Sequence, residues 1–389
     1  MKILYISALV SEKRVNDEFC RTGRNPGFAV QKFSRMLVKG LITNGADVLA
    51  LSKNINGNPK RMFLNSVKEI SNGVNYQYIP IVNIPIIKQV CLFLYTFFYT
   101  LFWGMRNKHQ KAIICDVLSI STSMGALIAS KINQVQSVAI VTDIFSLMAK
   151  KNARTQTLKV KIASKVNSLY CKSFSKYILL TEQMNEMVNS RHRPYIVMEA
   201  LCAPSIINKD PDRTSKAYPR TVLYAGGINE IYGLKMLAEG FVKADVTDTI
   251  LVYYGSGPFV EEYKKLCELH PNLKYRGVVT TEEIEKAEQE ATLLVNPRFS
   301  TEEYTKYSFP SKNMEYMASG TPVLTTQLPG MPKEYYPYVF LFEEETVEGY
   351  ANEIRRILSL SEEELRAFGK NARRFVLSKK IIICRLTDY

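Results

Sequence analysis

The sequence has only three histidines and no paired cysteines, and these shortages exclude several classes of site. His109, His192 and His270 stand in no recognisable catalytic setting. The 7 cysteines are scattered, and none forms a Cys-x-x-Cys pair or a Cys/His pair with the spacing of metal ligands. We therefore expect no structural zinc, no disulfide framework and a reducing compartment.

The sequence also shows no internal repeat, no low-complexity run and no recognisable secretory leader. Its first apolar run is short and polar residues follow at once, so we expect a β-strand over residues 2–7 rather than a signal peptide. A chain of 389 residues with 46% hydrophobic and 23% charged residues is typical of a globular protein with room for two domains, each with its own core.

Acidic residues are scarce in the N-terminal half. Residues 1–200 contain 27 Lys and Arg against 10 Asp and Glu, so the whole net charge of +14 comes from this half. Such an excess predicts an anionic partner, either a membrane or a nucleic acid. The aromatic residues of this half gather in an apolar run instead of alternating with basic residues, and no nucleic-acid-reading module is recognisable, so we expect no nucleic-acid partner.

Short apolar runs that alternate with helical periodicity indicate parallel strands and helices in both halves. Residues 27–44 predict the first helix, after a long loop over residues 7–27, and residues 361–378 predict the last helix. The proline-rich stretch 204–219 is the expected linker, which divides the chain into domains at 1–203 and 204–370 and a C-terminal segment at 371–389 that returns to the first domain. The expected strands are 2–7, 47–52, 112–121, 135–143, 176–182, 221–227, 249–257, 273–278 and 291–297.

The segment 295–325 is the most informative part of the sequence, and it predicts strand, loop, helix and strand in turn. Pro310 suits the first position of a helix, and Gly320 suits its end. Lys312 stands in the first helical turn and Arg298 at the mouth of the preceding loop, which together predict a phosphate site. Glu315 shares a helix face with Lys312 and could accept the two hydroxyls of a ribose.

Residues 315–323, EYMASGTPV, resemble the donor-binding signature of GT-B glycosyltransferases, in particular the retaining family-4-like enzymes of bacterial polysaccharide assembly. The resemblance implies an α/β GT-B fold of two Rossmann-like domains, with a nucleotide-sugar site in the second and an acceptor site in the first. It also implies that Glu315 holds the ribose, as the second acid of an E-x7-E motif. The position of the first acid is Tyr307, and Glu302 or Glu303 could replace it.

The cations that the family places after its first donor-domain strand are also absent, because those positions are Gly227 and Tyr232. A departing nucleoside diphosphate gains negative charge, so some cation must meet it. We expect Arg298 and Lys312 to replace the missing pair. The alternatives are a surface salt bridge of Arg298 with Glu302 or Glu303, and a solvated lysine in the first turn.

The remaining candidate residues follow strand ends. Asp143 ends an expected strand and could orient or deprotonate the acceptor hydroxyl, or it could cap the following helix. Asp116 is a weaker candidate of the same kind. By resemblance, the donor-binding set comprises Gly27, Gly227, Gly255, Gly257, Arg276, Ser311 and Glu315.

One apolar segment, residues 85–105, departs from the pattern of a globular domain. It lacks charge from residue 90 to residue 105, which is slightly short of a bilayer span, and its aromatic residues favour the interfacial zone. The alternatives are a buried helix, a helix that dips into one leaflet between flanking cations, and a true transmembrane span. We favour the second, with Phe93, Phe97, Phe98, Trp103, Arg106 and Lys108 as the contacts.

The sequence thus predicts a glycosyltransferase that moves a sugar from a nucleotide diphosphate sugar to a lipid-linked or other saccharide acceptor in cell-surface polysaccharide synthesis. It would lie at the cytoplasmic face of an anionic membrane and would use no metal or other cofactor. The alternatives are a degenerate GT-B membrane scaffold and a nucleotide-sugar epimerase, although an epimerase usually needs a histidine in its cleft.

Overall fold

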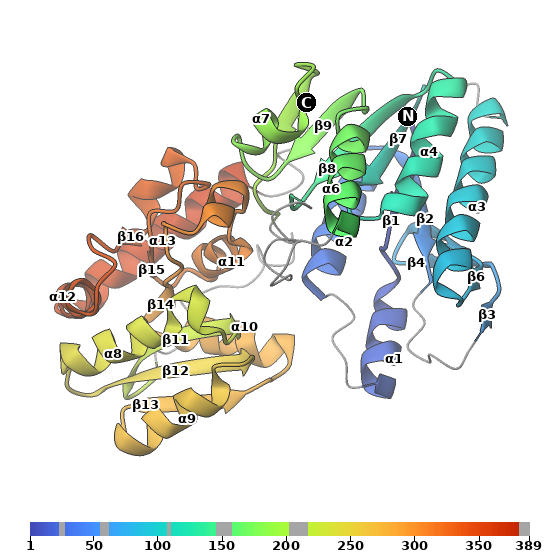
Figure 1. Ribbon diagram of the computed structural model, residues 1–389. Helices are drawn as coiled ribbons and strands as arrows, with labels where there is room; N and C mark the ends of the chain where they lie inside the picture. Colours follow the sequence, from blue (N-terminus) through green and yellow to red (C-terminus); the bar gives the residue numbers. More distant parts are fainter. Residues whose placement is uncertain (23–27, 55–61, 107–109, 145–157, 202–216, 381–389) are drawn as a thin grey trace. The chain divides into compact units, whose positions relative to one another are not determined.

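The computed structural model describes residues 1–22, 28–54, 62–106, 110–144, 158–201 and 217–380 (Figure 1). The chain divides into two compact units, Met1–Leu201 and Cys202–Cys384. Most of the expected linker and residues 381–389 lie outside the described residues. The described part of the last segment belongs to the second unit, where α13 (Glu362–Lys379) packs against α11 (Ser311–Ser319).

The first unit is built on an eight-stranded sheet in the order β10-β9-β8-β7-β1-β2-β5-β4. Every pairing is parallel except that of β4 with β5, which are joined by a short turn. The strands are β1 (Lys2–Ser7), β2 (Asp47–Lys53), β4 (Val67–Ser71), β5 (Val74–Ile79), β7 (Lys111–Asp116), β8 (Gln136–Val141), β9 (Lys176–Leu179) and β10 (Tyr195–Val197), with β3 (Phe63–Leu64) and β6 (Ile81–Val82) in a separate ribbon.

Helices cover the sheet of the first unit, and two details differ from the expectation. The expected loop over 7–27 contains a helix, α1, and the expected helix over 27–44 begins at Phe28. The helices are α1 (Glu12–Thr22), α2 (Phe28–Thr43), α3 (Pro85–Arg106), α4 (Ile120–Ile132), α6 (Leu158–Cys171) and α7 (Met184–Val188). The α1 prediction was wrong because its sequence is mostly polar and its apolar positions, such as the buried Val15, are few.

The second unit repeats the plan with six parallel strands in the order β13-β12-β11-β14-β15-β16. They are β11 (Arg220–Gly227), β12 (Thr249–Ser256), β13 (Leu273–Gly277), β14 (Leu293–Asn296), β15 (Val323–Thr325) and β16 (Phe340–Leu341). The connecting helices are α8 (Leu234–Ala244), α9 (Val260–Leu269), α10 (Thr281–Glu290), α11, α12 (Val347–Leu358) and α13, with short 3₁₀ turns η3 (Glu230–Tyr232), η4 (Glu303–Tyr307) and η5 (Lys333–Tyr338).

The expected α/β class with parallel sheets is confirmed, and a strand forms within each expected strand range. The range 112–121 was too long, because β7 ends at Asp116 and α4 begins at Ile120. Pro310 precedes α11 instead of occupying its first position, since its ψ of 104° is extended. The C-cap Gly320 has the left-handed φ of 84° that ends the helix as expected.

Candidate nucleotide-diphosphate site

Glycines at the carboxyl ends of β11 and β12 allow the two strand ends to approach closely. Gly226 and Gly255 have φ values of +151° and +129°, which residues with a side chain rarely adopt. A Cβ on Gly255 would lie 1.8 Å from the carbonyl oxygen of Gly226, and one on Gly257 would lie 2.0 Å from that of Ile228. The Gly255-Ser256-Gly257 turn is therefore required for packing, whatever ligand it meets.

The helix α11 is tied to the end of β11 by a buried tyrosine. The hydroxyl of Tyr316 accepts a 2.9 Å hydrogen bond from the N–H of Ala225 and donates a 3.3 Å bond to the carbonyl of the same residue. Since residues four apart share a helix face, this contact brings Lys312 to the next residue of the strand, Gly226.

A buried amide network fixes the first turn of α11 to the ends of β14 and β15. The side-chain nitrogen of Asn296 donates a 2.7 Å hydrogen bond to the side-chain oxygen of Asn313. The side-chain nitrogen of Asn313 in turn donates to the Thr325 hydroxyl at 3.2 Å. Thr325 closes the ring by donating to the carbonyl of Asn296 at 3.0 Å. The amino end of α11 is thus held rigidly at the carboxyl edge of the sheet, where parallel α/β sheets bind ligands.

The ammonium group of Lys312 lies directly over the glycine turn. A Cβ on Gly226 would come within 2.0 Å of Lys312 Nζ, so a side chain at this position would displace the end of the lysine. The same ammonium lies 5.7 Å from the centre of the Tyr224 ring. Ser311, the first residue of α11, is exposed beside it.

Arg298 reaches the same edge of the sheet from the loop after β14. Its guanidinium lies over the ring of Tyr232, 5.1 Å from the ring centre. Burial raises the pKa of the Tyr224 and Tyr304 hydroxyls, and the nearby charge of Arg298 opposes both rises. Within the described part of the chain Arg298 forms no ion pair. The alternative, a salt bridge of Arg298 with Glu302 or Glu303, is therefore absent from the described residues.

The structure therefore brings Arg298 and Lys312 together around Tyr224, beside the amino end of α11. Both cations belong to the second unit. Lys312 lies against Gly226, and Arg298 lies over Tyr232, whose ring carries the atom nearest to a Cβ built on Gly227. Two cations near a helix amino end could bind a group with two neighbouring negative charges. Tyr232, which stands where the family has a lysine, positions Arg298 through its ring.

Other residues expected at the donor site lie on the elements around it. Glu315 is half-buried one turn after Lys312 on α11, and Glu302 and Glu303 are exposed at the start of η4. Arg276 is exposed near the end of β13, where its charge opposes the rise that burial causes in the pKa of Tyr254.

In the first unit, the carboxylates expected at strand ends have different surroundings. Asp143 is half-buried just after β8, and the chain that follows it beyond residue 144 lies outside the described residues. Asp116 is buried at the end of β7, and its carboxylate accepts a 3.0 Å hydrogen bond from the N–H of Leu118. Burial raises the pKa of Asp116, while that hydrogen bond and the charge of Lys53 oppose the rise. The carboxylate of Asp116 thus accepts a hydrogen bond from the turn that follows β7, and it lies near the positive charge of Lys53.

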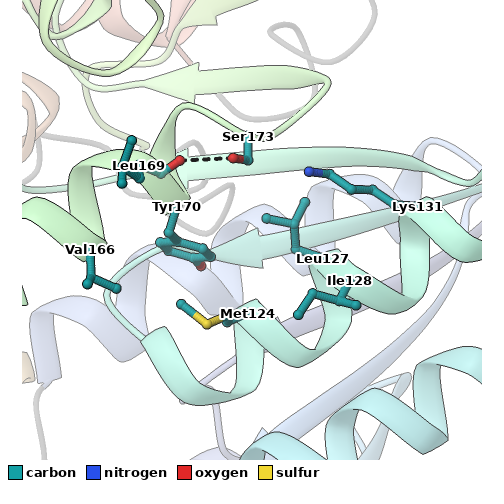
Figure 2. Close-up of a pocket in the computed structure, with 8 residues that line it drawn as sticks. All are labelled: Met124, Leu127, Ile128, Lys131, Val166, Leu169, Tyr170 and Ser173. Atoms are coloured by element: carbon teal, nitrogen blue, oxygen red, sulfur yellow. Dashed lines mark hydrogen bonds between the residues drawn. The ribbon is translucent and has the colours of Figure 1, made fainter.

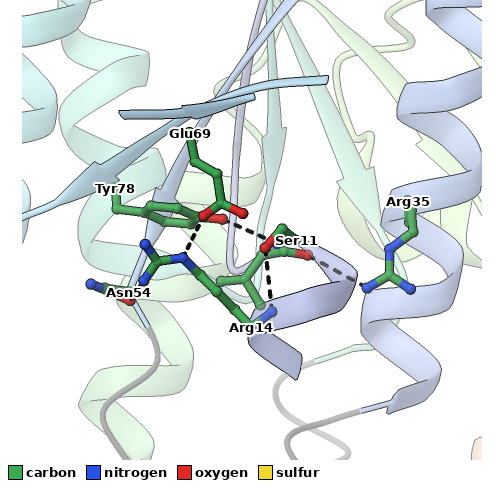
Figure 3. Close-up of polar contacts among 7 residues, drawn as sticks. Ser11, Arg14, Arg35, Asn54, Glu69 and Tyr78 are labelled. Atoms are coloured by element: carbon green, nitrogen blue, oxygen red, sulfur yellow. Dashed lines mark hydrogen bonds and ion pairs between the residues drawn. The ribbon is translucent and has the colours of Figure 1, made fainter. Parts of the chain in front are cut away.

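Arg14, which lies within the expected loop over residues 7–27, is bound within the first unit (Figure 3). Its Nε donates to the Glu69 carboxylate at 2.5 Å, a terminal nitrogen donates to Asn54 at 3.2 Å, and the guanidinium lies 4.3 Å from the centre of the Tyr78 ring. The Tyr78 hydroxyl accepts a 3.0 Å bond from the Ser11 N–H. This cluster holds the start of α1 against β4 and β5. Gly27 lies outside the described residues.

The expected membrane segment forms the helix α3, which is long and apolar enough to cross a membrane by length and composition, and only 17% of its most apolar window is buried. Of the expected contacts, Phe98 and Arg106 are exposed, whereas Phe93, Phe97 and Trp103 are half-buried. Phe93 stacks on Phe97 with ring centres 6.4 Å apart. Lys108 lies outside the described residues.

Comparison with known proteins bears on the fold and on the family of the second unit. Residues 206–375 match the model of the family described as "Glycosyl transferases group 1". No curated protein sequence matches the chain. Among solved structures, the sucrose-phosphate synthase of Thermosynechococcus elongatus is similar over 100% of this chain and 98% of its own, with a TM-score of 0.68 and 16% identity.

Two further similar structures contain UDP. The Anabaena protein HepE in complex with UDP has a TM-score of 0.63 and 13% identity, with 100% of this chain and 98% of that chain covered. A mutant of the S. aureus protein TarM, solved with UDP and an α-GlcNAc-glycerol, has a TM-score of 0.62 and 12% identity over the same shares of the two chains. The chain therefore has the GT-B fold, and residues 206–375 of its second unit match the glycosyl transferases group 1 model.

Proposed function

We propose that the protein is an enzyme that transfers a sugar from a nucleotide diphosphate sugar to a saccharide acceptor. The observation that carries this proposal is the meeting of Arg298 and Lys312 around Tyr224 at the amino end of α11. When the glycosidic bond of such a donor breaks, the diphosphate gains negative charge, and preformed cations stabilise that charge most where it develops. UDP in the similar HepE and TarM structures favours a nucleoside diphosphate as the ligand.

The neighbouring residues have complementary roles in this proposal. The amino end of α11, including the Ser311 N–H, would bind a phosphate oxygen, and Glu315 would accept the ribose hydroxyls one turn further along. Arg276 would lie near the base, and Asp143 of the first unit would orient or deprotonate the acceptor hydroxyl. The two cations would neutralise the diphosphate, so the reaction would need no metal ion. Retention of the anomeric configuration belongs to the proposal through the resemblance to family-4-like enzymes.

The acceptor in this proposal is a lipid-linked saccharide used in the synthesis of a cell-surface polysaccharide. The basic first unit and the exposed apolar residues of α3 support it, because an enzyme acting on a lipid-linked substrate benefits from binding the membrane that contains it. The protein would then be peripheral to the cytoplasmic face of the membrane.

A second candidate, a GT-B scaffold that binds a nucleotide without transferring sugar, is favoured by one observation. The family's paired cations are replaced by Gly227 and Tyr232, and Arg298 and Lys312 come from other elements. A scaffold would bind nucleoside diphosphates but would neither hydrolyse nor transfer the sugar of any nucleotide sugar.

The test is a thermal-shift panel of UDP, GDP, ADP and CDP, followed by a transfer and hydrolysis assay with the sugars of the base that binds. A ligand that binds only the folded chain raises its melting temperature. We expect one diphosphate to raise it, and Arg298→Ala and Lys312→Ala to remove most of that rise. Lys286→Ala, which removes an exposed lysine of α10 paired with Glu290, is the matched control. A rise that persists in both site variants would refute the proposed site.

A further inference from the structure

Three helices lie side by side over one face of the sheet in the first unit: α3, α4 and α6 (Figure 1). None of them contains a single Asp or Glu. They contain six basic residues, which are Lys88, Arg106, Lys131, Lys159, Lys161 and Lys165. A folded surface of this extent normally mixes both signs of charge, so this one-sided composition needs a cause.

The exposed residues of these helices are largely apolar. On α3 they recur about every four residues and form one stripe. They continue on α4 and on α6. Among the side chains that the structure describes, the exposed apolar residues are Ile86, Ile87, Val90, Leu94, Phe98, Phe102 and Met105 on α3, Ile128 and Ile132 on α4, and Val166 and Leu169 on α6.

The opposite side of α3 is fixed to α4 by close contact between small residues. Thr96, Thr100 and Gly104 are buried in α3. A Cβ on Gly125 of α4 would lie 2.5 Å from the carbonyl oxygen of Phe93, and Asn133 donates a 2.8 Å hydrogen bond to the carbonyl of Leu101. These contacts run along most of α3, so the exposed stripe is held outward and α3 lies along the unit instead of crossing a bilayer.

An apolar groove separates α4 from α6 on the same face (Figure 2). Its volume is about 300 Å³, and Met124, Leu127, Ile128, Val166 and Leu169 line most of it. Lys131 stands at its edge beside Ser173, whose hydroxyl donates to the carbonyl of Leu169 at 2.9 Å. The groove thus combines an apolar floor with a cation at its rim.

We propose that α3, α4 and α6 together form the surface that lies on an anionic phospholipid bilayer, with α3 parallel to the membrane plane. This inference rests on the membrane contact proposed above and extends it from one helix to a face of three, which we call the α3–α4–α6 face. Apolar side chains would enter the interface while Lys131 and Lys165 bind lipid phosphates, and the absence of carboxylates avoids repulsion by the lipids. Contact between two copies of this face would oppose like charges, which disfavours a symmetric dimer.

The test is co-sedimentation of the full chain with vesicles of phosphatidylglycerol and phosphatidylcholine in equal amounts, compared with phosphatidylcholine alone. Three variants alter different parts of the face: Leu94→Gln/Phe98→Gln on α3, Ile128→Gln/Leu169→Gln across the groove, and Lys131→Glu/Lys165→Glu. We expect each to reduce partitioning into the anionic vesicles by roughly tenfold or more. Ile70→Gln and Leu269→Gln remove apolar residues that are 79% and 72% exposed on β4 and α9, and they should bind as the wild type does.

The outcomes separate this inference from the broader proposals. Loss of binding in the α3 variant alone would overturn the three-helix face and leave membrane contact through α3. Failure of the wild type to sediment with anionic vesicles at low salt would overturn both, while its nucleotide-induced thermal shift would still report the donor site. Equal binding to neutral vesicles would overturn the role of the lysines. A different result would show that the face is an interface between two copies of the chain. In that case the wild type would not bind vesicles, sedimentation velocity would show a dimer, and the α3 variant would be a monomer.

Discussion

The hydroxyl of Tyr316 accepts a 2.9 Å hydrogen bond from the backbone N–H of Ala225, and this contact sets the geometry of the candidate site. It joins the middle of α11 to the last residues of β11. Lys312, one turn earlier on the helix, consequently lies against Gly226, where its ammonium can meet a ligand bound at the end of the strand. Tyr316, which is not expected to contact a ligand, thereby positions Lys312, which is expected to bind the diphosphate.

Tyr316→Phe should lower both the melting temperature and the affinity for a nucleoside diphosphate. The change leaves the buried N–H of Ala225 without its acceptor, which costs about 1–3 kcal/mol, and it loosens α11 on β11. Thermal unfolding with and without ligand measures both effects. Tyr218→Phe, at a tyrosine that is 82% exposed, is the control and should change neither. Equal melting temperatures for the two variants would mean that this hydrogen bond does not hold the helix.

Gly226→Ala should destabilise the chain more than Gly227→Ala does. At Gly226 the new methyl group would collide with Lys312 Nζ at 2.0 Å and the φ of +151° would be strained, whereas at Gly227 the nearest atom is 3.5 Å away on Tyr232. The strained backbone conformation costs on the order of 1–3 kcal/mol. Melting temperatures of the two variants provide the comparison, and an equal decrease in both would contradict the strained backbone at Gly226.

Tyr232→Leu should weaken diphosphate binding, and Tyr232→Phe should not. The guanidinium of Arg298 lies over the ring of Tyr232, and such a cation–π contact is worth about 0.5–1 kcal/mol at an exposed site. Leucine removes the ring and phenylalanine keeps it, so titration calorimetry should show a loss of roughly two- to fivefold in the leucine variant only. If phenylalanine causes the same loss as leucine, the hydroxyl acts instead of the ring.

Glu69→Gln should remove part of the acid dependence of stability in the first unit. Burial would raise the pKa of Glu69, but hydrogen bonds from Ser11 and Arg14 and the charge of Arg14 outweigh it, so the pKa lies below its ordinary value of 4.5. A lowered pKa means that the carboxylate stabilises the fold fully above the ordinary value and loses this effect as the pH falls through the folded-state value.

Melting temperatures of the wild type and of Glu69→Gln, followed from neutral pH down to about pH 3, test this sign. The wild type should be more stable at neutral pH, and the two curves should converge as the solution becomes acidic. If the two curves stay parallel over the whole range, protonation of Glu69 does not change the contribution of the Arg14–Glu69 ion pair to stability.

The parts of the fold that the sequence predicted depend on local pattern. The strands of both units are apolar runs bounded by glycine or polar residues, and the end of α11 follows from Gly320, a residue with a strong local preference. The hairpin of β4 and β5 was missed, although Asn72 and Gly73 at its turn have φ values of 50° and 76° and form a known hairpin signal.

The parts of the site that were missed depend on contacts between distant segments. Tyr316 and Asn313 look like ordinary helix residues, and only the fold shows that they bind Ala225 and Asn296. The ion pair of Arg14 was not predicted, because its partner Glu69 is 55 positions away. On α3 the composition indicated membrane contact, but the packing of Thr96 and Thr100 on α4 decides which residues are exposed, and Leu94 and Phe102 therefore replace Phe93 and Phe97 in the outward stripe.

The central claim, that Arg298 and Lys312 hold the diphosphate of a sugar donor, is tested most directly by calorimetric titration. The ligand is the nucleoside diphosphate that binds best in the thermal-shift panel, and its nucleoside is the reference. The account predicts that Arg298→Ala and Lys312→Ala each weaken diphosphate binding about tenfold or more, since a hydrogen bond to a charged group is worth about 1.5–3 kcal/mol, while nucleoside binding is unchanged. An unchanged diphosphate affinity in the double variant would contradict it.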